Sequence, residues 1–204
     1  MKMAKTGTIE LFFVDASHFV MGCDYLGSVY GFARRFIRTG SGRKRYNVLG
    51  ALNFISKKLT TITNDSYITS SQVCELLKKL AVEYAGKPIY IILDNASYQK
   101  CNLVKNLAVE IGINLIFIPS YSPNLNLIER FWKFTKSKLR TKYYTDFNEF
   151  KDRIDKITAS SDGQCKNEVD KLITEKVQLF DSPMNKKEKL SPIACVHNSI
   201  DLAA

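Results

Sequence analysis

Two apolar runs in the chain each end in an aspartate. Residues 8–15 are rich in β-branched and aromatic side chains, which predicts a strand that ends at Asp15. Residues 88–93 form a nearly continuous apolar run, the pattern of a strand covered on both faces, and this run ends at Asp94. A third buried strand is expected at residues 114–118. The chain therefore presents two strands with a carboxylate at their carboxyl ends.

Segments with helical periodicity lie between these strands. Apolar residues recur at three- and four-residue spacing over residues 73–84, after candidate caps at Ser70 and Ser71 and before a stop at Gly86. Residues 100–111 also have a helical pattern and lead into the third strand. The order of strand, helix and strand is typical of a parallel βαβ crossover.

The region between the two aspartates predicts an antiparallel meander. Extended segments are expected around residues 19–23 and 31–37, followed by a basic turn at residues 43–45 and a further segment over residues 46–59. Antiparallel and parallel pairing in one sheet, with helices between the strands, predicts an α/β fold with a mixed sheet.

A rigid loop precedes the last long helix. Residues 119–126 contain two prolines, two serines and two asparagines, which is typical of irregular structure. The helix that follows, from residue 127 to about 140, has one apolar stripe and one charged stripe. The charged stripe consists of Glu129, Lys133, Lys136 and Arg140. Another helix is expected over residues 147–157, and residues 181–204 are expected to be a weakly ordered tail after a single domain over residues 1–180.

The net charge of +10 points to polyanionic partners. The surplus lies entirely in residues 1–150, which favours nucleic acid, although membrane surfaces and acidic proteins remain alternatives on charge alone. No apolar run is long enough to span a bilayer or resembles a signal peptide, so we expect a cytoplasmic protein without a membrane partner. Five cysteines without CxxC spacing exclude an obvious disulfide framework or zinc site.

Three carboxylates can meet if the two aspartate-tipped strands lie side by side and the helix brings Glu129 to them. Carboxylate oxygens are ligands for Mg²⁺ or Mn²⁺, and two such ions can support phosphodiester chemistry. Ordinary alternatives remain for each residue. Asp15 and Asp94 could form turns or helix caps, and Glu129 could pair with Lys133 merely to support the helix. The basic row of Lys133, Lys136 and Arg140 could equally bind DNA phosphates.

Three segments of the chain carry distinctive motifs: FFVDASHF (residues 12–19), YIILDNASYQK (residues 90–100) and IPSYSPNLNLIERFWKFTK (residues 118–136). These segments resemble a known family, the mariner-like bacterial insertion-sequence transposases of the DDE superfamily of endonucleases. The 34 residues between Asp94 and Glu129 match the interval that defines this branch of the superfamily. The last two segments are the most specific part of the resemblance.

The resemblance implies an RNase H-like (integrase-type) mixed sheet flanked by helices, with Asp15, Asp94 and Glu129 as catalytic metal ligands. It also implies Mg²⁺, with Mn²⁺ as a substitute, and two ions in the site. The family reaction is hydrolytic DNA cleavage followed by strand transfer from the freed 3′-hydroxyl to target DNA. A homodimer acting on paired DNA ends is implied as well, and such a protein is associated with the bacterial nucleoid when bound.

The chain departs from the family pattern at several points. Only about eight residues precede the first catalytic strand, so we expect the usual helix-turn-helix DNA-reading module to be absent from this chain. Tyr98 and Gln99 stand where family members often have a histidine, and His18 is expected to serve packing or positioning. Two alternatives are a truncated, catalytically silent remnant that only binds DNA and a general RNase H-like nuclease outside transposition.

Overall fold

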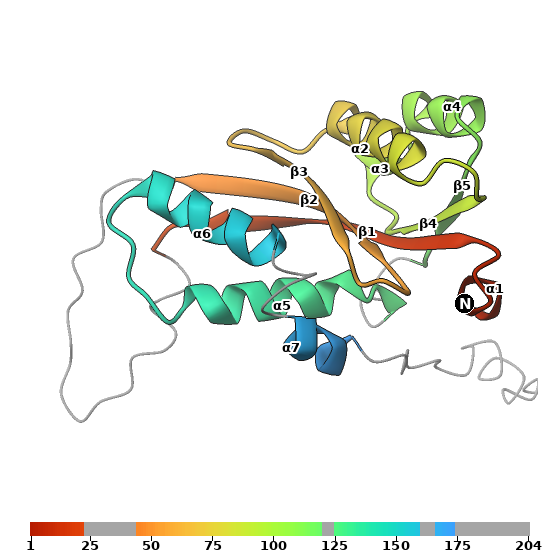
Figure 1. Cartoon of the computed structure of the whole chain (residues 1–204). Coiled ribbons are helices and arrows are strands. Elements are labelled where there is room, and N and C mark those ends of the chain that lie inside the picture. The colour runs from red at the N-terminus through yellow and green to blue at the C-terminus, as the bar shows by residue number, and fades with distance from the viewer. Residues whose placement is uncertain (23–43, 120–124, 160–165, 174–204) are drawn as a thin grey trace, which may run out of the picture.

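Five strands form one mixed sheet in the computed structural model of the chain (Figure 1), which describes residues 1–22, 44–119, 125–159 and 166–173. The strand order is β3-β2-β1-β4-β5. The strands are β1 (Glu10–Val20), β2 (Arg45–Asn53), β3 (Leu59–Asn64), β4 (Ile89–Leu93) and β5 (Ile113–Phe117).

The strand pairing confirms the predicted combination of a meander with a parallel unit. β1 pairs antiparallel with β2, and β2 pairs antiparallel with β3. On its other side β1 pairs parallel with β4, and β4 pairs parallel with β5. The central strand β1 therefore joins the antiparallel half of the sheet to the parallel half.

β1 is longer than the sequence pattern indicated. One strand runs from Glu10 to Val20 and joins the first expected segment to the start of the second, so the prediction that the first strand ends at Asp15 is wrong. The reason is that β2 pairs with β1 along residues 12–20, well past this aspartate. The expected segment at 46–59 is divided instead, by a turn in which Lys57 takes a φ of 60°.

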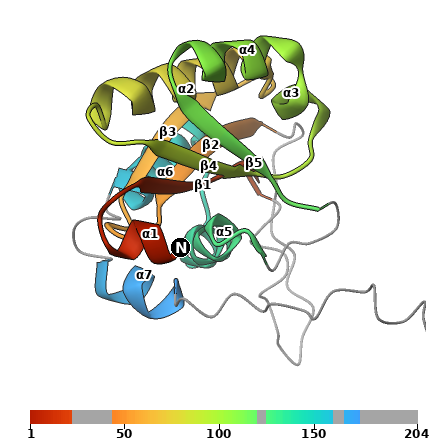
Figure 2. The ribbon, with the colours of Figure 1, turned by 90° about the vertical axis from the view of Figure 1, so that its right-hand side faces the viewer.

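Helices cover both faces of the sheet (Figures 1 and 2). One face is covered by α2 (Ser70–Glu83) and α4 (Asn102–Glu110), with the short α3 (Ser97–Lys100) beside them. The opposite face is covered by α5 (Ile128–Leu139) and α6 (Phe147–Ala159), while the short α1 (Lys2–Lys5) lies near the start of β1 and α7 (Lys166–Leu172) packs on α5 on the side away from the sheet. Sequence periodicity predicted α2, α4, α5 and α6, whereas α1, α3 and α7 span too few residues to give a clear period.

The alternation of side chains along β1 builds two cores at once. Leu11 and Phe13 point into the core beneath α5 and α6, and Phe12 and Val14 point into the core beneath α2 and α4. All four are at most 4% exposed. Burial of each such side chain contributes roughly 1.5–3 kcal/mol, so the strand that carries Asp15 is held firmly from both faces.

The cap of α2 differs from the predicted one. Thr69, rather than Ser70 or Ser71, is the N-cap residue, because its hydroxyl accepts from the backbone N–H of Ser71 and its own N–H donates to Gln72 Oε1 at 2.9 Å. This reciprocal arrangement is a capping box. The predicted segment at 31–37 and the tail at 181–204 lie outside the described residues.

Candidate active site

Asp15 and Asp94 follow the last matched pair of the β1–β4 ladder. That pair is Val14 with Leu93, and the next residue on each strand is an aspartate. Neighbouring strands are about 4.8 Å apart, so parallel pairing places the two carboxylates side by side. Asp94 leaves the strand here, and its Oδ1 accepts from the backbone N–H of Ala96 at 3.3 Å as the chain turns toward α3.

A glycine lets α5 approach β1 and β2 closely. Gly50 is the β2 residue opposite Asp15, and the indole ring of Trp132 lies against it. A Cβ atom at this glycine would lie 2.8 Å from Cη2 and Cζ2 of Trp132 and 3.1 Å from Cδ1 of Ile128. Glu129 stands one helical turn before Trp132, so this contact brings its part of α5 to the same region of the sheet.

The chain entering α5 is also tied to β1. Asn126 is buried, and its Nδ2 donates to the carbonyl oxygen of Val14 at 3.2 Å. The two residues are 112 positions apart in the sequence. The hydrogen bond therefore joins the segment just before Glu129 to the residue just before Asp15.

The three acids influence one another electrostatically. Burial, together with the negative charges of Asp94 and Glu129, raises the pKa of Asp15 to about 7, while a backbone hydrogen bond at Ala16 opposes the rise. Burial also raises the pKa of Glu129, where the Lys133 cation lowers it and Asp94 raises it. Mutual repulsion of this kind is characteristic of carboxylates that share a functional site.

The donor set fits a hard divalent cation. Asp15, Asp94 and Glu129 offer carboxylate oxygens, which Mg²⁺ and Mn²⁺ prefer, from three different elements of the fold. Within the described ranges, however, no group of three His, Cys, Asp or Glu side chains is arranged closely enough to hold an ion.

The predicted basic row lies along α5 beyond Glu129. Lys133 and Arg140 are exposed, with Arg140 as the C-cap residue of the helix. Lys136 is half-buried, and its Nζ lies 5.9 Å from the centroid of the Phe19 ring. All three cations thus stand on the helix that carries the third acid.

Some residues near the acids had no predicted role. Burial, followed by the charges of Asp94 and Asp15, raises the pKa of Tyr98 to about 12, so this hydroxyl stays protonated near both aspartates. Gln99 is fully buried, and its Nε2 donates to the Tyr98 oxygen at 3.4 Å. His18, expected to serve packing or positioning, is exposed, and its Nδ1 lies 2.6 Å from Oδ1 of Asn47.

The positions of Trp132 and Asn126 were predicted, but their contacts were not. The sequence pattern placed Trp132 in the apolar stripe of a helix and Asn126 at the end of a loop. The sequence shows that both residues lie three positions from Glu129. Only the fold shows which groups they contact.

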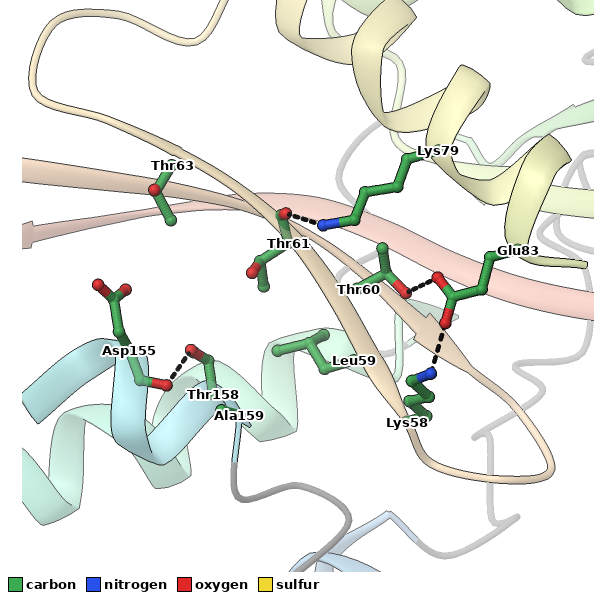
Figure 3. Close-up of a pocket in the computed structure, with 10 residues that line it drawn as sticks. All are labelled: Lys58, Leu59, Thr60, Thr61, Thr63, Lys79, Glu83, Asp155, Thr158 and Ala159. Atoms are coloured by element: carbon green, nitrogen blue, oxygen red, sulfur yellow. Dashed lines mark hydrogen bonds and ion pairs between the residues drawn. The ribbon is translucent and has the colours of Figure 1, made fainter. Parts of the chain in front are cut away.

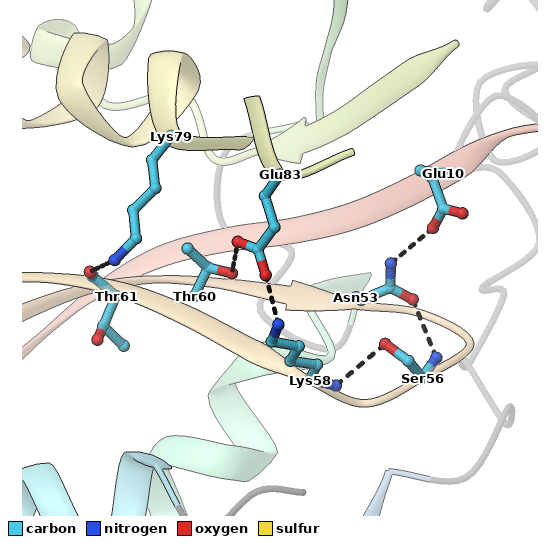
Figure 4. Close-up of polar contacts among 8 residues, drawn as sticks. All are labelled: Glu10, Asn53, Ser56, Lys58, Thr60, Thr61, Lys79 and Glu83. Atoms are coloured by element: carbon cyan, nitrogen blue, oxygen red, sulfur yellow. Dashed lines mark hydrogen bonds and ion pairs between the residues drawn. The ribbon is translucent and has the colours of Figure 1, made fainter. Parts of the chain in front are cut away.

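A pocket of about 500 Å³ lies elsewhere, along the outer edge of β3 between α2 and α6 (Figure 3). Its polar groups already have partners: Lys58 pairs with Glu83, and Lys79 Nζ donates to the Thr61 carbonyl at 3.3 Å (Figure 4). The pocket contains none of the three predicted acids and is not the candidate active site.

The mixed five-stranded sheet flanked by helices is an RNase H-like fold, as the sequence predicted. The chain belongs to the DDE superfamily endonucleases, because residues 10–151 match the family of that description. The chain is therefore an endonuclease by family. No match was found among curated proteins. Within the described ranges, no helix is both long and apolar enough to cross a membrane.

Solved structures with a similar fold include transposases and an integrase. A paired-end complex of Mos1 transposase with the left transposon end gives a TM-score of 0.58 at 10% identity, covering 88% of this chain and 59% of that chain. The Mos1 catalytic domain with raltegravir and Mg gives 0.56 at 9% identity, covering 88% and 90%. The HTLV-2 integrase catalytic core with magnesium gives 0.50 at 15% identity, covering 75% and 85%. At these identities the likeness concerns the fold.

Proposed function

We propose that this chain is the catalytic domain of a DNA transposase that cleaves DNA and transfers strands with the help of divalent metal ions. Asp15, Asp94 and Glu129 are its metal ligands in this proposal. The observation that carries it is the adjacency of Asp15 and Asp94 at the end of the β1–β4 ladder, with Glu129 electrostatically coupled to both.

The three carboxylates would hold Mg²⁺, or Mn²⁺ in its place, as a pair of ions. When bound, such ions activate a water or a 3′-hydroxyl and stabilise the leaving oxygen of the phosphodiester. Asp15 has a raised pKa of about 7, so its carboxyl must lose a proton to become a ligand near neutral pH. Its half-buried position on a strand fixed by two cores keeps the ligand in place for a substrate phosphate.

The basic row supplies the DNA contacts in this proposal. Lys133, Lys136 and Arg140 extend along α5 from the acidic end, so a phosphate backbone that enters the site can continue along the helix. The net charge of +10 supports an anionic partner. The Mos1 complex contains a transposon end, and one HTLV-2 integrase core is a dimeric form with magnesium. We infer DNA, a second copy of the chain and Mg²⁺ as partners here.

The test is nicking of supercoiled plasmid by the purified chain with Mn²⁺, with Mg²⁺ and with a chelator. Asp94→Asn and Glu129→Gln remove ligand charge while keeping size, so we expect both to abolish metal-dependent nicking and to retain the wild-type circular dichroism spectrum. Asp65→Asn is the matched control, because Asp65 is an exposed acid paired with Lys151 away from the site. It should nick like the wild type.

The outcomes separate the proposal from its alternatives. Nicking that persists in Asp94→Asn contradicts the metal-ligand assignment. DNA binding without nicking by the wild-type chain, even after fusion to a DNA-reading module, identifies a silent remnant. A preference for RNA-containing substrates over DNA identifies a general nuclease instead.

A further inference from the structure

Two buried polar side chains flank Glu129 at equal spacing in the sequence. Asn126 lies three residues before it and is 3% exposed, while Trp132 lies three residues after it and is 4% exposed. Three residues correspond to nearly one helical turn, so Trp132 and Glu129 lie on adjoining parts of the same side of α5. Both flanking side chains reach back to the strands that surround Asp15.

Asn126 connects the start of α5 to β1 through the NH2 group of its side-chain amide. Nδ2 donates to the carbonyl oxygen of Val14, the residue before Asp15. Its Oδ1 is buried and finds no hydrogen-bond partner among the described residues. The donated bond restrains the distance between the backbone at Asp15 and the backbone at Glu129, because each acid is within three residues of a bonded group.

Trp132 approaches Asp15 from the neighbouring strand β2. Its six-membered ring lies on Gly50, the residue opposite Asp15 in the β1–β2 ladder. The indole Nε1 is buried and also lacks a hydrogen-bond partner in the part of the chain that the structure describes. This N–H lies near the Asp15 carboxyl and lowers its pKa, although the geometry falls short of a hydrogen bond.

Buried polar atoms without partners are rare in native proteins, and they call for a reason such as a catalytic role or a bound ion. Here a donor, the Trp132 N–H, and an acceptor, Asn126 Oδ1, both lie within one turn of Glu129. Ligating carboxylates are commonly oriented by hydrogen bonds to their second oxygen. The indole N–H is placed to orient Asp15 in this way once the carboxylates close around an ion.

We propose that Asn126 and Trp132 are positioning residues that hold Asp15 and Glu129 together as one metal site. Asn126 acts through the carbonyl of Val14, and Trp132 acts through its N–H toward the Asp15 carboxylate and its ring contact with Gly50. The inference rests on the proposed function of the three acids. A simple packing role is the alternative, since the Trp132 ring also contacts Phe19 at a centroid distance of 6.1 Å.

The first experiment uses the fact that Trp132 is the single tryptophan of the chain. Intrinsic tryptophan fluorescence of the wild-type protein therefore reports on this indole alone. We expect a saturable change in its emission during titration with Mg²⁺, and no such change in Asp15→Asn. Unchanged emission in a wild-type protein that nicks DNA with Mg²⁺ overturns the inference and leaves the proposed function intact. Absence of both responses contradicts the proposed function, and the inference with it.

The second experiment measures Mn²⁺ binding directly, from the electron paramagnetic resonance signal of free Mn²⁺. Trp132→Phe keeps an aromatic ring and removes the N–H, so we expect it to weaken Mn²⁺ binding by about 10- to 100-fold, the range for groups that orient a ligand. Asn126→Leu, which keeps the side-chain size and removes the bond to Val14, should have a similar effect.

Phe131→Leu is the matched control, because Phe131 is a neighbouring buried aromatic residue of α5 without a polar atom. It should lower the melting temperature and leave Mn²⁺ affinity near the wild-type value. Wild-type Mn²⁺ affinity in folded Trp132→Phe overturns the inference, as does an equal loss of affinity in Phe131→Leu. The fluorescence titration decides the question if Trp132→Phe does not fold.

Discussion

The Trp132 ring lies so close to Gly50 that a larger residue at this position of β2 would require the ring to shift. A Cβ atom there would lie 2.8 Å from two ring carbons of the indole. Gly50 also pairs with Asp15, so this close contact between α5 and the sheet occurs beside the first candidate acid. The absence of a side chain at Gly50 therefore helps to set the position of Glu129 on α5.

Gly50→Ala should destabilise the protein and impair cleavage. At an unobstructed strand position alanine would stabilise by roughly 0.5–1 kcal/mol relative to glycine. Here the added methyl group overpacks against Trp132, which costs about 1–3 kcal/mol and displaces α5. Thermal unfolding and plasmid nicking measure the two effects.

A double-mutant cycle controls this prediction. Trp132→Phe removes the distal ring atoms that meet the new methyl group, so the combined cost with Gly50→Ala should be smaller than the sum of the two single changes. A strictly additive result would show that the steric contact is not the cause.

Asp15→Asn should make the metal-free protein more stable above neutral pH. Burial and the neighbouring acids raise the pKa of Asp15 from 3.8 to about 7 in the folded state. Between these two pKa values the folded state keeps a proton that the unfolded state has released. The free energy of unfolding therefore falls as pH rises toward 7. Because asparagine does not titrate, the variant does not lose this stability as pH rises.

The measurement is thermal unfolding of the wild type and Asp15→Asn with chelator at several pH values. The difference in melting temperature should grow in favour of the variant as pH rises from about 5 to 8, by at least about 2 °C, a shift that corresponds to less than 1 kcal/mol in a domain of this size. Added Mn²⁺ should stabilise only the wild type. A difference that does not change with pH would contradict the raised pKa.

Replacement of Lys133 and Lys136 by alanine should weaken DNA binding and reduce its salt dependence. Each phosphate contact that is lost should lower the slope of log K against log salt by roughly 0.9. The control is Lys58→Ala with Lys79→Ala, because both of these lysines have partners at the β3 edge, away from the acids (Figure 4). An equal reduction of the slope in the control pair would contradict the proposal that α5 is the DNA-binding element.

Thr69→Ala should reduce stability without changing the chemistry. Loss of an N-cap side chain typically costs about 1 kcal/mol, and the capping box of α2 includes Gln72 as the reciprocal partner. The residue is not among the groups that contact the acids. Thermal unfolding should show the loss, while the rate of nicking per folded molecule stays at the wild-type value; a slower rate would connect α2 to the active site.

Local patterns in the sequence were sufficient to predict most of the elements. Helical spacing predicted α5 to within one residue at each end, since Ile128–Leu139 lies inside the expected 127–140. The short apolar run before Asp94 predicted a strand over residues 88–93, and β4 spans Ile89–Leu93. These patterns depend on neighbours within a few residues, and such periodicities are readable without knowledge of the partner. The three candidate acids were chosen from the predicted strand ends and from the motifs of the family resemblance.

Tertiary structure alone decided how those elements meet. Asp15 lies within a strand because β2 extends the pairing beyond it, and it adjoins Asp94 because β4 ends at Leu93. The bond from Asn126 to Val14 joins residues 112 positions apart, and no local period encodes such a contact. The sequence by itself determined the candidate acids and most of the helices and strands, because motifs and periodicities are local. Long-range pairing and packing determined the distances between those residues, because they depend on which surfaces become buried together.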